Sequence, residues 1–156
     1  MFPPQFIVIE RIACQQQIGS KKRIMEKLGE LLASHEPGLS SKLVFDQLLD
    51  RERLGNTGLG MGIALPHARM REVERPVGAF IQLAIPVDYD AIDQRPVDLA
   101  FGMLVPESAR EEHLQLLARL AGLFSHPRLC AELRDARTPE QVVRHFEEWE
   151  SVPVTC

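Results

Sequence analysis

Residues 77–105 read VGAFIQLAIPVDYDAIDQRPVDLAFGMLV and contain two short apolar runs. The runs 77–85 and 97–105 are bounded by prolines at positions 76, 86, 96 and 106. Apolar runs of this length between prolines are typical of strands that are covered on both faces. Shorter runs at 63–65 and 12–16 predict two further strands.

Helical patterns precede these strands. Ser20 can cap a helix that continues to about residue 34, because its apolar residues recur at the spacing of one buried face. Ser40 or Ser41 can cap a second helix, which Gly55 would end.

The helical period returns after residue 107. Thr138 and Pro139 have the order of a cap and a first-turn proline, and residues 127–136 predict a short helix before them. The inward-facing residues are expected to be Leu116, Leu117, Leu120, Ala121 and Phe124, then Val142, Phe146 and Trp149. Helices at both ends with strands between them predict an α/β fold, a single domain over residues 1–156 in which helices flank both faces of a mixed sheet.

The composition restricts the class of protein. A chain of 156 residues, 45% of them hydrophobic, is sufficient for one sizeable core. The net charge of −4 is spread along the chain, without the basic stripe of a nucleic-acid-binding protein or a polybasic membrane anchor. No apolar run approaches the ~20 residues of a membrane span. Three cysteines without Cys-x-x-Cys spacing indicate a reducing compartment, so we expect a cytoplasmic protein with no metal and no cofactor.

Residues 51–71 read RERLGNTGLGMGIALPHARMR and include three glycines, at positions 58, 60 and 62. A dinucleotide-binding loop would need glycine or alanine at position 63, which is isoleucine, and would follow a strand. A mononucleotide phosphate loop would end in Gly-Lys-Ser/Thr, which is absent from this sequence. The glycines are therefore expected to shape a tight turn, with a secondary role for their backbone amides in holding a phosphate.

His67 follows the run 63–65 after a proline, and Arg69 and Arg71 come next. We expect a strand to deliver this imidazole into the glycine-lined turn, flanked by the arginines. Imidazole is partly neutral near pH 7 and can act as a nucleophile. Arginine stays charged and donates to phosphate in a planar fork. These residues predict a histidine that accepts a phosphoryl group; the alternative is a structural or surface histidine.

Two further residues are candidates for the same site. His113 shares the inward side of its helix with the apolar stripe, so it either faces His67 or satisfies a backbone carbonyl at the helix end. Arg51 ends the second helix, where a surface cation is favoured in any case. Arg53 offers the same chemistry as Arg51.

The segment LGNTGLGMGIALPHARM, residues 54–70, closely resembles the phosphohistidine segment of the fructose–mannitol type IIA components of the bacterial phosphotransferase system. The resemblance continues in SKKRIMEKLGELL, VFDQLLDRERLG and LVPESAREEHLQLLARLAGLF, and it covers roughly residues 20–146. The nitrogen-regulatory branch is the nearest match. Where the family often has asparagine, this chain has Met61, which removes a polar side chain from the glycine loop.

The resemblance implies a mixed sheet flanked by helices and a phosphotransferase component that works through a phosphohistidine. It places the phosphoryl group on the tele nitrogen of His67, with His113 of the EEHL segment and Arg51 of the RE step beside it. The implied donor is a histidine phosphocarrier protein, charged in turn from phosphoenolpyruvate. The implied output is regulatory, through targets that in this branch include kinases and potassium transporters.

Three alternatives stay open. A sugar-specific member would pass the phosphate to a IIB domain, and a degenerate member would be a non-phosphorylated binding module. A hydrolase is the weakest, because the sequence contains no His-x-x-x-His pair and no Gly-x-Ser-x-Gly elbow. A carrier needs an exposed apolar rim for its partner, for which Leu59, Met61 and Met70 are candidates. Charging Met61 or Met70 is then expected to slow transfer without unfolding the protein.

Overall fold

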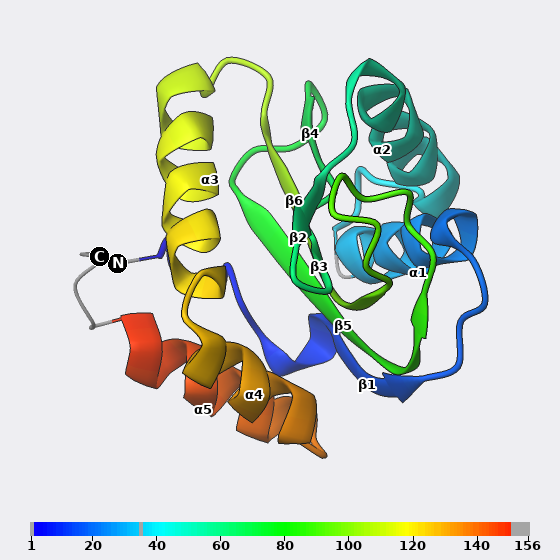
Figure 1. Cartoon of the computed structure of the whole chain (residues 1–156). Helices are drawn as coiled ribbons and strands as arrows, with labels where there is room; N and C mark the ends of the chain where they lie inside the picture. The colour runs from blue at the N-terminus through cyan, green and yellow to red at the C-terminus, as the bar shows by residue number, and fades with distance from the viewer. Residues whose placement is uncertain (1, 35, 151–156) are drawn as a thin grey trace.

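A six-stranded sheet between two groups of helices forms the protein in the computed structural model, which describes residues 2–34 and 36–150 (Figure 1). The elements in chain order are η1 (Ile9–Arg11), β1 (Ile12–Gln16), α1 (Lys21–Ala33), α2 (Ser41–Leu54), β2 (Gly58–Gly60), β3 (Ile63–Ala64), β4 (His67–Met70), β5 (Val77–Val87), β6 (Val97–Pro106), α3 (Arg110–Phe124), α4 (Pro127–Asp135) and α5 (Pro139–Glu150).

The sheet is mixed, with strand order β1-β5-β6-β3-β2. The central pair β5 and β6 is antiparallel, and β1 runs parallel to β5. On its other side β6 pairs in parallel with two short strands in succession, first β3 and then β4. The chain therefore meets β6 twice within residues 63–70, and His67 is the first residue of the second contact.

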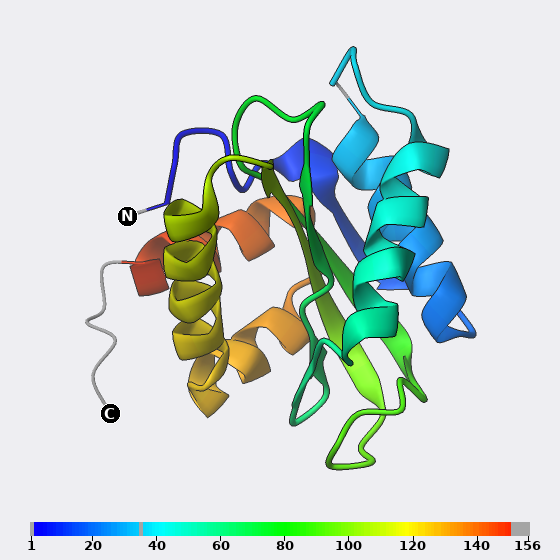
Figure 2. The same cartoon turned by 90° about the horizontal axis from the view of Figure 1, so that it is seen from above.

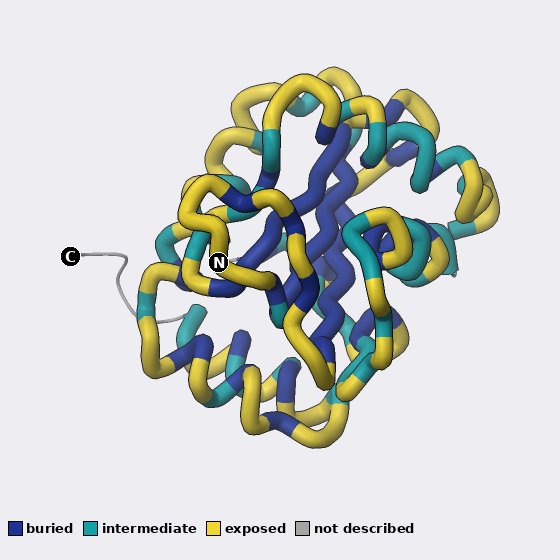
Figure 3. Tube along the Cα trace, turned by 45° about the vertical axis from the view of Figure 1, so that its right-hand side comes forward, coloured by how far each residue is buried: buried dark blue, intermediate teal, exposed yellow. Residues whose placement is uncertain are grey.

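Both faces of the sheet are covered, as the sequence predicted. Figure 2 shows α1 and α2 on one side of the sheet and α3, α4 and α5 on the other. Phe80 and Phe101 face the second group of helices and pack around Phe146 of α5, with ring centroids 5.5 and 5.8 Å from its ring. Ile81 and Leu104 face α1 and α2. The central strands β5 and β6 accordingly contain the longest buried runs of the sheet (Figure 3).

The predicted helix caps are confirmed. The hydroxyls of Ser20 and Ser40 accept hydrogen bonds from the third backbone amides of α1 and α2, at 3.2 and 3.1 Å. Gly55 is the C-cap of α2. The Thr138 hydroxyl accepts from the amide of Gln141 in the first turn of α5.

Two details differ from the prediction. β5 continues through Pro86 to Val87, whereas the proline was expected to end it at residue 85. The register with β6 is interrupted between Gln82 and Val87, so the missing proline N–H breaks no ladder bond there. Ala121, expected to face inward, is exposed on α3, because the helix turns that side toward solvent.

Met61 has a left-handed backbone conformation in the turn between β2 and β3, with φ of 59°. This region disfavours side chains with a Cβ by about 1–2 kcal/mol and is tolerated best by glycine and asparagine. We expect Met61→Asn to raise the free energy of unfolding by about 0.5–1 kcal/mol, as measured by urea denaturation. Leu59, exposed on the same hairpin, is not among the residues with positive φ. Leu59→Asn should therefore not raise the free energy of unfolding. An equal increase in both variants would contradict the inference that Met61 is strained.

Candidate functional site

His67 begins β4 at the point where β6 carries Met103. The carbonyl of Pro66 accepts a hydrogen bond from the amide of Met103 at 3.0 Å, so the backbone before the histidine is tied to the central strand. The residue is 7% exposed. Backbone contacts with β6 therefore hold this histidine in place, and little of the histidine is exposed to solvent.

The imidazole of His67 has a defined tautomer. Its Nδ1 lies 2.7 Å from the carbonyl oxygen of Leu65. A carbonyl can only accept, so Nδ1 carries the proton and donates, and Nε2 keeps its lone pair. Burial lowers the pKa of His67 below its ordinary value, and the positive charge of Arg51 acts in the same direction, although the Leu65 bond opposes them. Both effects favour the neutral, nucleophilic ring at physiological pH.

His113 faces His67 from α3. The two ring centroids are 5.3 Å apart, and the rings meet edge to face at 64°. The Nε2 of His113 is buried and makes no hydrogen bond within the described residues, so the backbone-carbonyl alternative has no support at that nitrogen. Burial lowers the pKa of His113 to about 4, and the positive charges of Arg69 and of His67, when that ring is protonated, act in the same direction. The site therefore contains two neutral imidazoles side by side.

A cavity of about 510 Å³ opens beside the two histidines. Its lining comes from the end of α2, β4 and the start of α3, and consists of Gln47, Asp50, Arg51, Leu54, His67, Ala68, Arg69, Glu107, Arg110 and His113. Arginine side chains and imidazoles outnumber the two carboxylates. The cavity therefore suits an anion.

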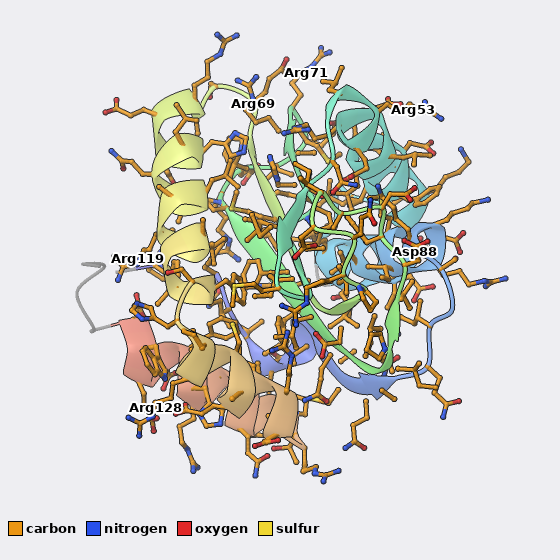
Figure 4. All side chains as sticks on the ribbon, in the orientation of Figure 1. Arg53, Arg69, Arg71, Asp88, Arg119 and Arg128 are labelled. Atoms are coloured by element: carbon orange, nitrogen blue, oxygen red, sulfur yellow. The ribbon has the colours of Figure 1, made fainter. Side chains whose placement is uncertain are left out.

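Of the two arginines that the sequence left open, Arg51 lines this cavity and Arg53 does not. Arg51 is half-buried, and its Nη1 donates to the carbonyl of Gly55 at 3.1 Å. Arg53 pairs with Asp50 at 2.9 Å on the exposed side of α2, and Figure 4 shows its side chain pointing away from the molecule. Arg69 is exposed at the top of the cavity, close to the loop before α3 (Figure 4).

The prediction that the glycines surround His67 is wrong. The carbonyl of Gly62 accepts from the amide of Leu99, whereas His67 pairs with Met103. These positions on β6 are four residues apart, or roughly 13 Å at about 3.3 Å per residue. A Cβ on Gly62 would meet the Arg134 side chain at 2.7 Å, so the glycines make room for other contacts. His67 itself lies in β4, because β6 extends beyond its pairing with β3 and pairs there with a second short strand.

The predicted apolar rim is also corrected. Met70 is 2% exposed and packs in the core between the sheet and α2. Charging it would unfold the protein rather than test docking. Leu59 and Met61 are exposed, but they lie with the glycine turn at the other end of β6. The exposed apolar residues near the cavity are instead Leu54 and Leu114, at 84% and 67%.

Glu52 was not predicted by sequence reasoning to matter. It follows Arg51 directly and is 9% exposed, although a glutamate in the last turn of a helix is normally solvated. Its partners come from three other segments of the chain, so no local pattern reveals them.

The cavity contains no cluster of the kind that binds a metal. In the described chain, the one group of three possible ligands is Glu132, His145 and Glu148, on α4 and α5. None of them lines the cavity. Within residues 2–34 and 36–150, no helix combines the length and apolarity that crossing a membrane requires.

His113 gives a pH-dependent prediction. Its pKa is about 4 in the folded protein and 6.5 ordinarily, so between these values the unfolded chain binds a proton that the folded chain does not. The His113 contribution is therefore present above pH 6.5 and is lost as the pH falls toward 4. We expect urea denaturation to show that the free energy of unfolding falls more steeply with decreasing pH in the parent protein than in His113→Gln. Equal slopes for the two proteins would contradict the shifted pKa.

Comparisons with known proteins give matches over most of the chain. Residues 5–149 match the family model described as the phosphoenolpyruvate-dependent sugar phosphotransferase system, EIIA 2. The nitrogen regulatory protein of Pseudomonas aeruginosa is 45% identical over 122 residues, which are 78% of this chain and 79% of that protein. The nitrogen regulatory protein of Escherichia coli (strain K12) is 40% identical over 144 residues, which are 92% and 85% of the two chains.

The fold is also found in solved structures. The nitrogen regulatory protein IIA-Ntr from Neisseria meningitidis superposes with a TM-score of 0.85 at 42% identity, over 90% of this chain and 95% of that one. The mannitol IIA of Escherichia coli superposes with a TM-score of 0.73 at 22% identity, over 87% and 95% of the two chains. The second likeness concerns the fold alone.

Proposed function

Because the chain belongs to the EIIA 2 family of the phosphoenolpyruvate-dependent sugar phosphotransferase system, we propose that His67 accepts a phosphoryl group from a histidine phosphocarrier protein. We propose further that the output is regulatory and cytoplasmic, through binding to protein targets that distinguish the two states. The observation that carries the proposal is the hydrogen bond from Nδ1 to the Leu65 carbonyl. It leaves Nε2, the tele nitrogen, as the nucleophile beside the arginine-lined cavity.

The transfer follows from these contacts. The Nε2 lone pair of His67 forms a bond to phosphorus while the bond from phosphorus to the donor imidazole breaks, and the Nδ1 proton stays on the Leu65 bond. Arg51 neutralises the phosphoryl oxygens from the end of α2. His113 donates to one of these oxygens when its Nε2 carries the ring proton, since that nitrogen has no other hydrogen bond among the described residues.

Phosphorylation of the purified protein tests the proposal. The protein is incubated with phosphoenolpyruvate, enzyme I and a histidine phosphocarrier protein, and intact mass is followed. We expect one phosphoryl group per chain, on an adduct that is stable in base and labile in acid. No adduct with any such donor would favour the non-phosphorylated binding module instead.

A sugar-specific role is the second candidate. The relatives at 40% and 45% identity are nitrogen regulatory proteins, whereas a fructose-specific EIIA component of the phosphotransferase system is 33% identical over 134 residues. This ranking favours the regulatory role. Transfer of the phosphoryl group from this protein to a IIB domain, measured directly, would reverse the ranking.

The exposed apolar residues near the cavity give a prediction about docking. Leu54 lines the cavity and is 84% exposed, so a partner that delivers a phosphoryl group to His67 must cover it. We expect Leu54→Asp to lower kcat/KM for the phosphocarrier about tenfold, the loss of one moderate contact of an interface. Ile92, 90% exposed in the loop before β6, provides the matched control. Ile92→Asp should transfer normally, and an equal loss in both variants would contradict docking at Leu54.

A further inference from the structure

Glu52 is a buried carboxylate with a full set of partners. Its Oε2 accepts from the backbone amide of Thr57 at 2.9 Å and pairs with Nζ of Lys21 at 2.9 Å. Its Oε1 accepts from the hydroxyl of Thr57. Lys21 also lies over the ring of Tyr89, at 4.5 Å from the ring centre. One carboxylate therefore joins the start of α1, the end of α2 and the segment before β2.

The direction of each hydrogen bond can be assigned. The Thr57 hydroxyl has one proton, which it donates to the carboxylate of Glu52. The Tyr89 hydroxyl lies 3.0 Å from the Thr57 oxygen and 3.4 Å from Oε1 of Glu52, and it donates its one proton toward these two oxygens. Burial raises the pKa of Tyr89, so this phenol stays protonated. The amide and hydroxyl of Thr57 and the ammonium of Lys21 all donate to Glu52, and only an acceptor at that position satisfies all three.

The same cluster reaches His67 through the backbone. The carbonyl of Thr57 accepts from the amide of Leu65 at 2.9 Å, and the carbonyl of Leu65 accepts from Nδ1 of His67 at 2.7 Å. Glu52 is thus three hydrogen bonds from the imidazole, by way of Thr57 and Leu65. On its other side it is bonded covalently to Arg51, which lines the cavity.

We propose that Glu52 is a positioning residue, which fixes the tautomer and angle of the His67 ring and the place of Arg51 relative to it. This inference rests on the proposed phosphoryl transfer. The carboxylate is required, because the amide of glutamine would turn an N–H group toward one of the donors from Thr57 or Lys21 and leave it unsatisfied. Movement of Thr57 would then loosen Leu65 and the ring that it holds.

Glu52→Gln tests the proposal, because it keeps the volume of the side chain. We expect the rate at saturating phosphocarrier to fall roughly tenfold to a hundredfold, the range for a small misplacement of reacting groups. KM should not change, since Glu52 is buried and a docked partner does not touch it. Asp98→Asn is the matched control: it breaks a carboxylate pair with Arg134, at 2.8 Å, near the glycine turn. This control should lose stability and transfer at the parent rate.

A second readout separates positioning from simple loss of stability. Nitrogen-15 NMR of the imidazoles should show one tautomer for His67 in the parent protein and in Asp98→Asn, and a mixture in Glu52→Gln. If Glu52→Gln does not fold, Thr57→Val should give the same signature with a smaller loss of rate, because it removes only the hydroxyl donor. A folded variant with the parent rate and one tautomer would overturn the proposal. The NMR comparison needs no phosphoryl donor, so it holds even if the proposed function fails.

Discussion

His67→Ala is expected to abolish phosphoryl acceptance, leaving no acid-labile adduct after long incubation with the donor system. Nε2 of His67 is the nucleophile on the proposed function, and removing the nucleophile removes the covalent step itself. His113 is not expected to replace it, because its imidazole lies on α3, with its ring centroid 5.3 Å from that of His67, and on the proposed function it donates to the phosphoryl group from there. Intact mass measures the outcome.

The control for this variant is His126→Ala, which removes an imidazole that contacts Trp149 and not the cavity. It should be phosphorylated to the parent level. Retention of one phosphoryl group in His67→Ala, mapped to another residue, would contradict the assignment of the acceptor.

Arg51→Met is expected to lower the rate of phosphoryl acceptance by roughly a hundredfold to a thousandfold. Methionine keeps most of the apolar length of the side chain and removes the cation that, on the proposed function, faces the phosphoryl oxygens. Loss of one well-placed donor to developing charge has effects of this order. The rate is measured by rapid quench at saturating phosphocarrier, and unfolding in urea is measured in parallel.

Arg53→Met is the matched control two residues away. Arg53 pairs with Asp50 on the exposed side of α2, in an ion pair of the kind that contributes little to stability. This variant should transfer normally. A large loss in Arg53→Met with none in Arg51→Met would reverse the roles that the geometry favours.

Much of the fold could be predicted from the sequence, because its signals are local. Ser20 and Ser40 cap helices through bonds to amides three residues ahead, and the apolar runs of β5 and β6 reflect burial on both faces. The contact between the rings of His67 and His113 could also be predicted, since the spacing of the apolar stripe on α3 turns His113 inward. These inferences depend on periodicity and on caps, which neighbouring residues encode.

The errors come from contacts between distant segments. The glycines were placed around His67 because they lie near it in sequence, but the strand between them carries the histidine along β6 and away from the turn. Met70 was expected at the surface because methionines often line docking sites, and pairing with β6 buries it instead. The role of Glu52 depends on Lys21 and Tyr89, which lie 31 and 37 residues away along the chain.

The backbone around His67 is held on both sides, by the amide of Leu65 on Thr57 and by the carbonyl of Pro66 on Met103. These two hydrogen bonds should keep the backbone in place when a phosphoryl group is added to the His67 ring. On the proposed function, phosphorylation would then change the electrostatic potential at the cavity mouth and leave the backbone conformation unchanged. The sign of the potential there reverses. Partners would sense that field only at close range, within a screening length of about 8 Å at physiological salt. Their ability to tell the two states apart should therefore fade as salt is added.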